Sequence, residues 1–179
     1  TAFAGTKPKV VRCLLEKLPF DAPFEVAAEC SPLAERTLSL MEAVYAGEDV
    51  NTEHVRLAYE QVKPYTRTVL QTVLRIPLGF VTSYGAVAKV AGGGARAVGN
   101  AMAANPFPPL VPCHRVVNSN FKLGGYSGGG LDVKLEMLKR ERKGYTEPKK
   151  ISVREKTLQV FPVEFVLNEN SKVHPLNQD

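Results

Sequence analysis

The chain has 179 residues, a formal net charge of +5 and a composition that is 44% hydrophobic and 23% charged, which indicates a globular protein with one main core. No run reaches the roughly 18 apolar residues of a membrane-spanning helix, and the first residues lack a signal peptide's apolar core, so we expect an intracellular protein with no membrane partner. The 3 cysteines are scattered and do not suggest a disulfide framework.

The positive charge is concentrated in residues 64–147. This segment holds 11 Lys and Arg against 4 Asp and Glu, a net of +7, whereas the remainder holds 12 against 14, a net of −2. A basic module beside a mildly acidic remainder favours a polyphosphate ligand. Solvated surface charge explains most basic proteins as well, so the charge alone does not decide the function.

The first 63 residues are predicted to form a small α/β part. Two short apolar runs before residue 29 suit strands or short helices. A helix should begin with Ser31 as N-cap and Pro32 at its first position, and should end near Gly47. A second helix is expected over residues 52–62.

Cysteines and a histidine in this part leave two alternatives open. Cys13 and Cys30 could form a disulfide if the source is a hyperthermophile, which the sequence does not decide. Cys13, Cys30 and His54 offer only three scattered ligands where a structural zinc site wants four. We therefore expect no metal and no cofactor.

A helix with a following turn is predicted after Pro64. Apolar residues recur at helical spacing over residues 66–76, and Pro77 should end this helix. Residues 79–81 are expected to turn the chain.

Two short helices joined by three glycines follow. Ser83 can cap a helix over residues 84–90, Gly92–Gly94 form a tight turn, and a second helix should cover residues 95–104. A helix, a short glycine turn and a second helix are the outline of a helix-turn-helix.

The second of these helices is thin, because most of its side chains are alanine or glycine. A thin helix can enter the minor groove of DNA, which is only about 6 Å wide. Arg96 is the long cation at its start, and a planar guanidinium stacks well. The alternative is that small residues permit close helix packing and that Arg96 is a surface charge.

Cys113 and His114 are adjacent within the apolar run of residues 111–117, in a loop predicted to lead into a strand. A thiol needs a base or positive surroundings to act as a nucleophile at neutral pH, and His114 and Arg115 could supply them. Against this, a buried cysteine is usually an inert small hydrophobe, and neighbours in a strand point to opposite faces.

The last third contains a flexible loop, a helix and a tail. Five glycines in residues 124–130 suit a lid beside a flat ligand. A helix that carries Glu141 is expected over residues 131–143. Residues 157–167 are β-prone with Pro162 inside, which predicts an edge strand that could join the N-terminal part, and residues 168–179 should be frayed.

Four ordered blocks of this sequence resemble the O6-alkylguanine-DNA alkyltransferase family: residues 76–85, 96–102, 105–116 with its Pro-Cys-His-Arg-Val motif, and 124–129. The resemblance implies an α/β (α+β) fold, with a small N-terminal α/β part and a mainly helical C-terminal domain that carries a winged-helix-like helix-turn-helix. It implies a shortened N-terminal α/β domain (1–63), a DNA-binding and catalytic domain (64–147) and a C-terminal extension (148–179).

The resemblance also implies an activity, which is DNA repair by a single-turnover methylated-DNA–protein-cysteine methyltransferase. O6-alkylguanine would be flipped out of duplex DNA, and its alkyl group would pass irreversibly to Cys113. The implied partner is double-stranded DNA carrying alkylated guanine, bound by a monomer without a cofactor. The compartment would be the cytoplasm in a prokaryote and the nucleus in a eukaryote.

Roles for individual residues are carried over from the matching motif positions. The catalytic set comprises the nucleophile, a base acting through a water, its orienting carboxylate, a brace for the turn and a phenol donor, namely Cys113, His114, Glu141, Asn105 and Tyr84. The substrate-binding set is Pro108, Val116, Tyr126, Ser127 and Gly128. The DNA-binding set is Arg96, Ala97, Gly99, Tyr84 and Arg115.

Two rival functions remain. A non-catalytic lesion sensor resembling alkyltransferase-like proteins would lack the cysteine, so Cys113 argues against it. A thiol hydrolase would use Cys113 and His114, but adjacent residues rarely form such a dyad and no oxyanion element stands out.

Overall fold

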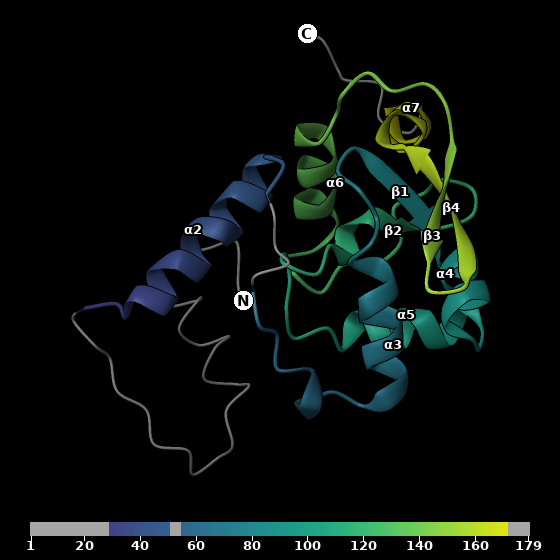
Figure 1. Ribbon diagram of the computed structural model, residues 1–179. Helices are drawn as coiled ribbons and strands as arrows, with labels where there is room; N and C mark the ends of the chain where they lie inside the picture. Colours follow the sequence, from purple (N-terminus) through teal and green to yellow (C-terminus); the bar gives the residue numbers. More distant parts are fainter. Residues whose placement is uncertain (1–28, 51–54, 172–179) are drawn as a thin grey trace, which may run out of the picture.

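The computed structural model describes residues 29–50 and 55–171 (Figure 1). These residues form six α-helices and a four-stranded sheet, so the predicted mixed α/β class is confirmed. The two apolar runs before residue 29, as well as Cys13 and His54, lie outside the described residues. Across the two described ranges, every helix is too short or too polar to cross a bilayer.

The first described helix, α2 (Pro32–Ala46), has the ends that the sequence predicts. The Ser31 hydroxyl accepts from the backbone N–H of Ala34 at 3.2 Å, and Gly47 ends the helix with φ at 79°. A left-handed residue at this position is most easily supplied by glycine. Arg140 holds this end in place, because its guanidinium lies 4.3 Å from the Tyr45 ring centroid and donates to the Tyr45 carbonyl.

The helix predicted over residues 52–62 is wrong in its described part, which contains only the short 3-10 helix η1 (Tyr59–Gln61). Tertiary contacts hold this segment in its irregular form, since Arg67 Nε donates to the Tyr59 carbonyl at 2.9 Å and the Tyr59 ring meets Phe107 edge-on. Such contacts override a weak local preference for helix.

Helix α3 (Pro64–Val73) begins two residues earlier and ends three residues earlier than predicted. Pro64 suits the first helical position because its missing N–H would have no partner there. At the other end, Arg75 and Ile76 make shorter-range bonds to the carbonyls of Thr72 and Val73, so the chain tightens into a turn.

Helices α4 (Tyr84–Ala91) and α5 (Ala95–Ala103) confirm the predicted pair with a glycine turn between them. The Ser83 hydroxyl accepts from the Ala86 N–H at 3.1 Å, which is the predicted cap of α4. The chain therefore enters α4 directly from the strand before it.

That strand is β1 (Phe80–Ser83), which corrects the turn predicted over residues 79–81. Only Gly79 turns the chain, with φ at 79°. The sheet order is β2-β1-β4-β3. Strand β2 (Val116–Val117) runs parallel to β1, whereas β4 (Lys156–Pro162) is antiparallel to both β1 and β3 (Lys149–Val153).

The tail corrects two expectations. Strand β4 is an inner strand, with Phe161 opposite Val81, and it joins β1 rather than the N-terminal part. It ends at Pro162, and the chain then forms helix α7 (Val163–Ser171) instead of continuing as a strand. A helix is favoured over a strand here because Val163 and Val166, one turn apart, are both fully buried. The predicted fraying of residues 168–179 is thus wrong up to residue 171, and the rest lies outside the described residues.

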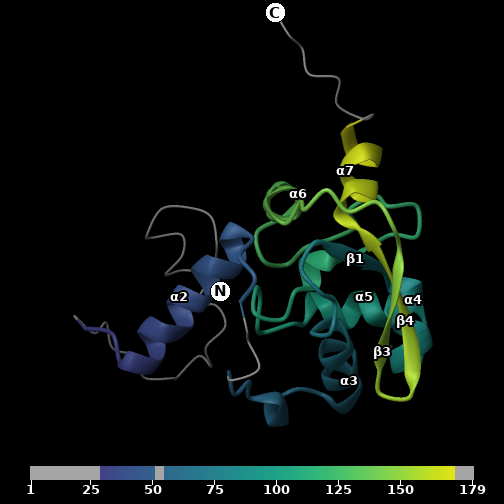
Figure 2. The ribbon, with the colours of Figure 1, turned by 45° about the horizontal axis from the view of Figure 1, so that its top comes forward.

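The sheet separates two apolar cores, because neighbouring residues of a strand face opposite sides. Phe80 and Val116 pack with α3, α4 and α5, whereas Val81 and Val117 pack with α6 (Leu131–Arg140) and α7. Figure 2 shows the two groups of helices on either side of β1. The turn with the cysteine enters β2 and therefore lies between both layers.

Candidate active site

The cysteine lies in a tight turn that leads directly into strand β2, as predicted. Cys113–Arg115 form the 3-10 helix η2, closed by a bond from the Arg115 N–H to the Pro112 carbonyl at 2.9 Å. A 3-10 helix has three residues per turn, so Cys113 and His114 do not point to opposite faces as they would in a strand. Both residues are buried.

Next to the cysteine, His114, Glu141 and Arg115 form a hydrogen-bonded chain of polar and charged side chains. His114 Nε2 lies 2.7 Å from Glu141 Oε1, and neither side chain is exposed. Arg115 donates to both carboxylate oxygens of Glu141, at distances from 2.9 to 3.1 Å. Glu141 is the C-cap of α6, which ends at Arg140, three residues before the predicted end.

The ionisation states follow from these contacts. Burial alone would raise the pKa of Glu141, but the charges of and hydrogen bonds from His114 and Arg115 outweigh it and lower the pKa to about 2. Burial lowers the pKa of His114, against the opposing attraction of Glu141, so the imidazole is neutral at pH 7. An ionised carboxylate only accepts, so Nε2 carries the proton and Nδ1 keeps a free lone pair.

The Nδ1 atom of His114 is buried and has no hydrogen-bond partner among the described residues. Buried polar atoms of this kind are normally satisfied by protein or by water. A neutral imidazole with one nitrogen held by a carboxylate and the other unpartnered is arranged as a general base.

Asn105 holds the sulfur of Cys113. Its Nδ2 donates to Cys113 Sγ and to the Val111 carbonyl, both at 3.3 Å, while its Oδ1 accepts from the Phe107 N–H at 2.9 Å. Burial raises the pKa of the Cys113 thiol, while the Asn105 bond and the charge of Lys134 act in the opposite direction. The site thus keeps the thiol protonated until a base removes the proton.

Lys134 is a site residue that the sequence reasoning missed. It is fully buried, and its Nζ donates to the carbonyls of Val116 at 2.7 Å, Gly125 at 3.2 Å and Leu123. Burial lowers the pKa of Lys134 to about 8, so the side chain is still charged at pH 7. Its three acceptors match the three hydrogens of an ammonium. Lys134 ties the end of the turn that holds Cys113 to the glycine loop.

Lys134→Met should lower the free energy of unfolding by about 2 kcal/mol or more, because three buried carbonyls lose their shared donor. Urea denaturation measures this loss. The matched control is Lys139→Met on the same helix, whose side chain is 58% exposed and which should change stability by less than about 0.5 kcal/mol. Equal stabilities of the two variants would contradict the anchoring role.

Cys113 opens into a cavity of about 880 Å³ between α4, α5 and the glycine loop. Six predicted site residues line it, namely Cys113, Tyr84, Arg96, Gly99, Tyr126 and Ser127. Eight further lining residues are not in the predicted site sets, namely Gly85, Ala95, Met102, Ala103, Asn118, Ser119, Gly124 and Gly125. Some of them lie within the matching blocks, but no role was assigned to those positions.

Other predicted residues do not line this cavity. Pro108 and Val116 are buried, and Ala97 lies beside the cavity on α5. Gly128 is buried beneath the Tyr126 ring, where an added Cβ would lie 2.6 Å from ring atoms. A glycine at this position therefore lets the Tyr126 ring lie against the loop.

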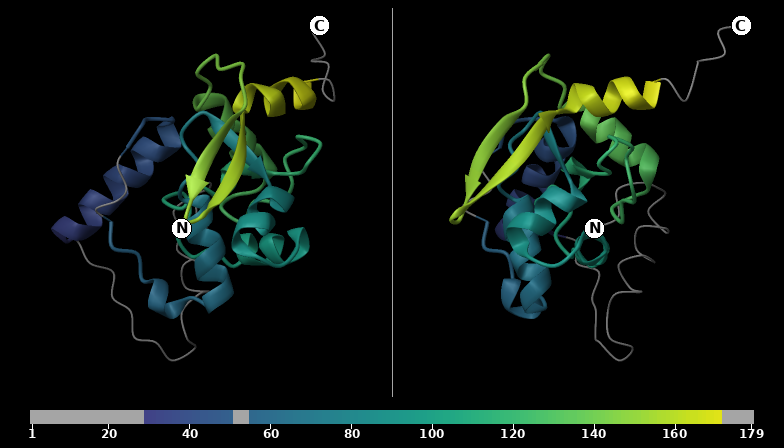
Figure 3. Two further views of the ribbon diagram at one scale, coloured as in Figure 1. Left: turned by 45° about the vertical axis from the view of Figure 1, so that its right-hand side comes forward. Right: turned by 90° about the vertical axis from the view of Figure 1, so that its right-hand side faces the viewer.

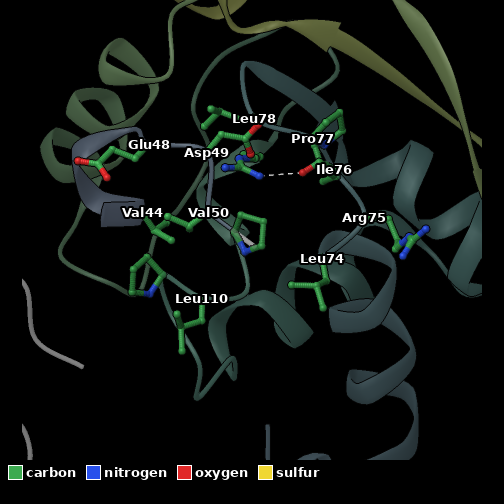
Figure 4. A pocket seen from close by; sticks show the side chains of 13 residues that line it. Val44, Glu48, Asp49, Val50, Leu74, Arg75, Ile76, Pro77, Leu78 and Leu110 are labelled. Carbon is green, nitrogen blue, oxygen red and sulfur yellow. Dashed lines mark hydrogen bonds between the residues drawn. The ribbon is translucent and has the colours of Figure 1, made fainter. Parts of the chain in front are cut away.

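Arg115 lies inward, which argues against its predicted contact with DNA. Its guanidinium donates to Glu141 and to the Ile76 carbonyl, the latter at 2.7 Å, and its side chain is 11% exposed. It lines a separate cavity of about 280 Å³, together with Pro112 and residues that include Val44 and Leu74, which are labelled in Figure 4. Its role is to fix the carboxylate that holds His114.

Comparisons with known proteins identify the family. The profile described as 6-O-methylguanine DNA methyltransferase, DNA binding domain, matches residues 64–143. The methylated-DNA–protein-cysteine methyltransferase of Pyrobaculum aerophilum is 52% identical over 69 residues, which cover 38% of this chain and 46% of that protein. The corresponding protein of Archaeoglobus fulgidus is 40% identical over 101 residues, or 56% of this chain and 66% of that protein. The chain thus spans only about half to two thirds of these relatives.

Solved structures extend the similarity. The O6-methylguanine-DNA methyltransferase of Pyrococcus kodakaraensis superposes with a TM-score of 0.62 at 30% identity, covering 78% of this chain and 83% of that one. A variant of the Mycobacterium tuberculosis O6-methylguanine methyltransferase gives a TM-score of 0.50 at 31% identity, covering 71% and 79%. Fold and site therefore define a mixed α/β protein with a buried cysteine that lines a cavity. The chain belongs to the O6-methylguanine-DNA methyltransferase family.

Proposed function

We propose that this chain is a DNA repair protein that transfers the alkyl group of O6-alkylguanine in duplex DNA to its own Cys113. The observation that carries the proposal is the position of this cysteine at the floor of a large cavity, with the neutral His114 and the ionised Glu141 buried directly behind it. A thiol with an adjoining base and an orienting carboxylate is the arrangement of nucleophilic catalysis. Family membership supports the same assignment.

In the proposed reaction, Nδ1 of His114 takes the thiol proton through a water, and the thiolate attacks the alkyl carbon. The S–C bond forms as the O6–C bond breaks, and His114 returns the proton to the guanine, which stays in the DNA strand. Asn105 and the charged Lys134 stabilise the thiolate. The product is a thioether, which no group in the cavity is arranged to cleave, so each molecule reacts once.

Several groups of the cavity could contact the extruded guanine. Burial raises the pKa of Tyr84, so its hydroxyl stays protonated and can donate to the ring of guanine. We assign Ser127 to O6 and Tyr126 to an apolar wall, supported by Gly128 from below and by Pro108 from behind the turn. The carbonyls of Cys113 and Val116 would accept from the exocyclic amine. Val116 already accepts from Lys134, but a carbonyl oxygen has a second lone pair.

DNA would be bound by α4, the glycine turn and α5 acting as a helix-turn-helix of winged-helix type. Arg96, Ala97 and Gly99 lie in the first half of α5, and Arg96 and Gly99 line the cavity that holds Cys113. A thin helix in the minor groove would place Arg96 at the stack, where its guanidinium can fill the space of the extruded base. Tyr84 would press on the phosphate beside that base.

We further propose that residues 64–147 contain both the DNA-binding and the catalytic groups. Residues 1–63 would form an N-terminal α/β domain, and residues 148–179 an extension. One molecule would act alone on one lesion.

Intact mass spectrometry after incubation with a duplex that carries O6-methylguanine tests the proposal. We expect a permanent adduct on Cys113, one methyl group per molecule. Tight binding without an adduct would instead indicate a lesion sensor, and catalytic turnover of an ester would indicate a thiol hydrolase. Either result would overturn the proposed transfer.

Arg96→Ala should slow repair in duplex DNA about 10- to 100-fold, because the gap left in the stack costs a few kcal/mol when nothing fills it. The reaction with free O6-benzylguanine should stay at the wild-type rate, since no stack must be opened. Rates of adduct formation on both substrates measure the difference. Arg96→Lys keeps the charge without the planar group and should recover only part of the loss. An equal loss on both substrates would exclude the stacking role.

A further inference from the structure

The hairpin β3–β4 lies beyond the residues matched by the family profile, which end at 143. It is strongly basic and exposed, carrying Lys149, Lys150, Arg154 and Lys156 against the single acid Glu155. The hairpin leads directly into α7 (Figure 3), and Figures 1 and 2 both show its free end beside α4.

Side-chain contacts fix the free end of the hairpin against the helices. Lys156 Nζ donates to the carbonyls of Lys89 and Val90, at 3.3 and 3.1 Å, in the last turn of α4. Arg154 donates to Gln71 Oε1 on α3 at 2.8 Å. A cation at the carboxyl end of a helix is favoured by the helix dipole. The basic hairpin is therefore held in one place and not left to move in solvent.

Between the hairpin and α4 lies a groove of about 290 Å³ with two lysines on its walls. Lys89 and Ala86 line it from α4, and Lys150, Thr157 and Gln159 from the hairpin. Lys150 lies opposite Gln159 in the strand register, so these side chains share one face. Within the described residues, neither lysine ammonium has a hydrogen-bond or ion-pair partner. Two unpaired cations beside a hydroxyl and an amide are the donor set of a phosphate site.

Helix α4 connects this groove to the cavity that holds Cys113. Its first residues, Tyr84 and Gly85, line the cavity, whereas Ala86 and Lys89 line the groove. A duplex whose lesion enters the cavity would continue along α4, and its backbone would reach the groove. We propose that Lys89 and the β3–β4 hairpin form a second contact with the DNA backbone, outside the helix-turn-helix. This inference rests on the proposed function, because it takes duplex DNA as the ligand.

The test compares two charge-matched double variants of the full chain. K89Q/K150Q removes the two unpaired cations of the groove, and K139Q/K143Q removes two exposed cations at the end of α6. Binding to an unmodified duplex is followed by fluorescence anisotropy over a range of salt concentrations. Each lost phosphate contact lowers the slope of log K against log salt by about 0.9, so K89Q/K150Q should flatten the slope by about 2. Between 50 and 200 mM salt, the wild type should therefore lose roughly tenfold more affinity than this variant.

The expected pattern is a flatter slope for K89Q/K150Q, the wild-type slope for K139Q/K143Q, and recovery in K89R/K150R, which keeps both charges. Equal slopes for the two glutamine variants would overturn the hairpin contact. Reaction with free O6-benzylguanine, read by intact mass, separates this failure from that of the proposed function. If every variant forms an adduct and the salt slopes are unchanged, only the hairpin contact is contradicted. If the wild type forms no adduct, the proposed function itself is contradicted.

Discussion

Cys113→Ser should form no adduct with alkylated DNA, whatever the excess of lesion. The thiolate is the nucleophile, and a serine hydroxyl is far less acidic than a thiol, so a single neutral imidazole cannot ionise it to a useful extent. The substitution is nearly isosteric at a buried position, and Asn105 can donate to an oxygen as well as to the sulfur. The fold and the affinity for duplex DNA should therefore match those of the wild type. Intact mass measures the adduct, and anisotropy the affinity.

Cys30→Ser is the matched control for this experiment. Cys30 is the other free cysteine among the described residues, and it is exposed where Cys113 is buried. Its replacement should leave one adduct per molecule. If Cys113→Ser still acquires an adduct at the wild-type rate and Cys30→Ser does not, the nucleophile has been assigned to the wrong cysteine.

Glu141→Gln should lower the free energy of unfolding by about 3 kcal/mol or more and slow adduct formation about 100-fold or more. The amide removes the negative charge, so the largely buried Arg115 guanidinium loses its ionic partner. The amide can also donate to Nε2 of His114 through its NH2 group. The imidazole proton would then move to Nδ1, which would lose the lone pair that takes the thiol proton. Urea denaturation measures the stability, and the time course of adduct mass measures the rate.

The wild type should also show an acid instability that this variant lacks. The pKa of Glu141 lies near 2 in the folded protein against about 4.5 ordinarily, so the unfolded chain binds the proton more tightly. Stability from this group is complete above about pH 4.5 and is lost as the pH falls toward 2, a loss of about 3 kcal/mol. Glu136→Gln on the same helix is the control, because that side chain is 44% exposed and its ion pairs contribute little. Identical acid profiles for wild type and Glu141→Gln would contradict the buried pair.

Local signals predicted the capped starts of two helices, but they failed at the ends of α3 and α6 and where long-range packing decides. The caps at Ser31 and Ser83 depend on neighbouring residues only, and both are present. The tail could not be predicted in the same way, since its valines and phenylalanines suit a strand in isolation. Residues 163–171 become a helix because Val163 and Val166 fill the core beside α6, a requirement set by elements far away in the sequence.

For the site, the motif resemblance indicated Cys113, His114 and Glu141 together, although the histidine and the glutamate are 27 residues apart. Spacing could have added Lys134. Lys134, Met137, Leu138 and Glu141 follow the one-face helical pattern of i, i+3, i+4 and i+7, and all four are buried. Two charges on an apolar face are a signal of buried ion or hydrogen-bond networks. Arg115 could not be placed this way, because only the fold brings it to the carbonyl of Ile76.

The inner position of β4 has a consequence for shortened versions of the protein. Strand β1 is bordered by β2 on one side and by β4 on the other, and β4 comes from the residues after 147. Ending the chain at residue 143, where the family profile ends, would remove that neighbour of β1 and uncover the apolar ring of Phe80. Backbone groups left open along such a border recruit strands from other molecules, so the trimmed polypeptide should self-associate instead of remaining dispersed.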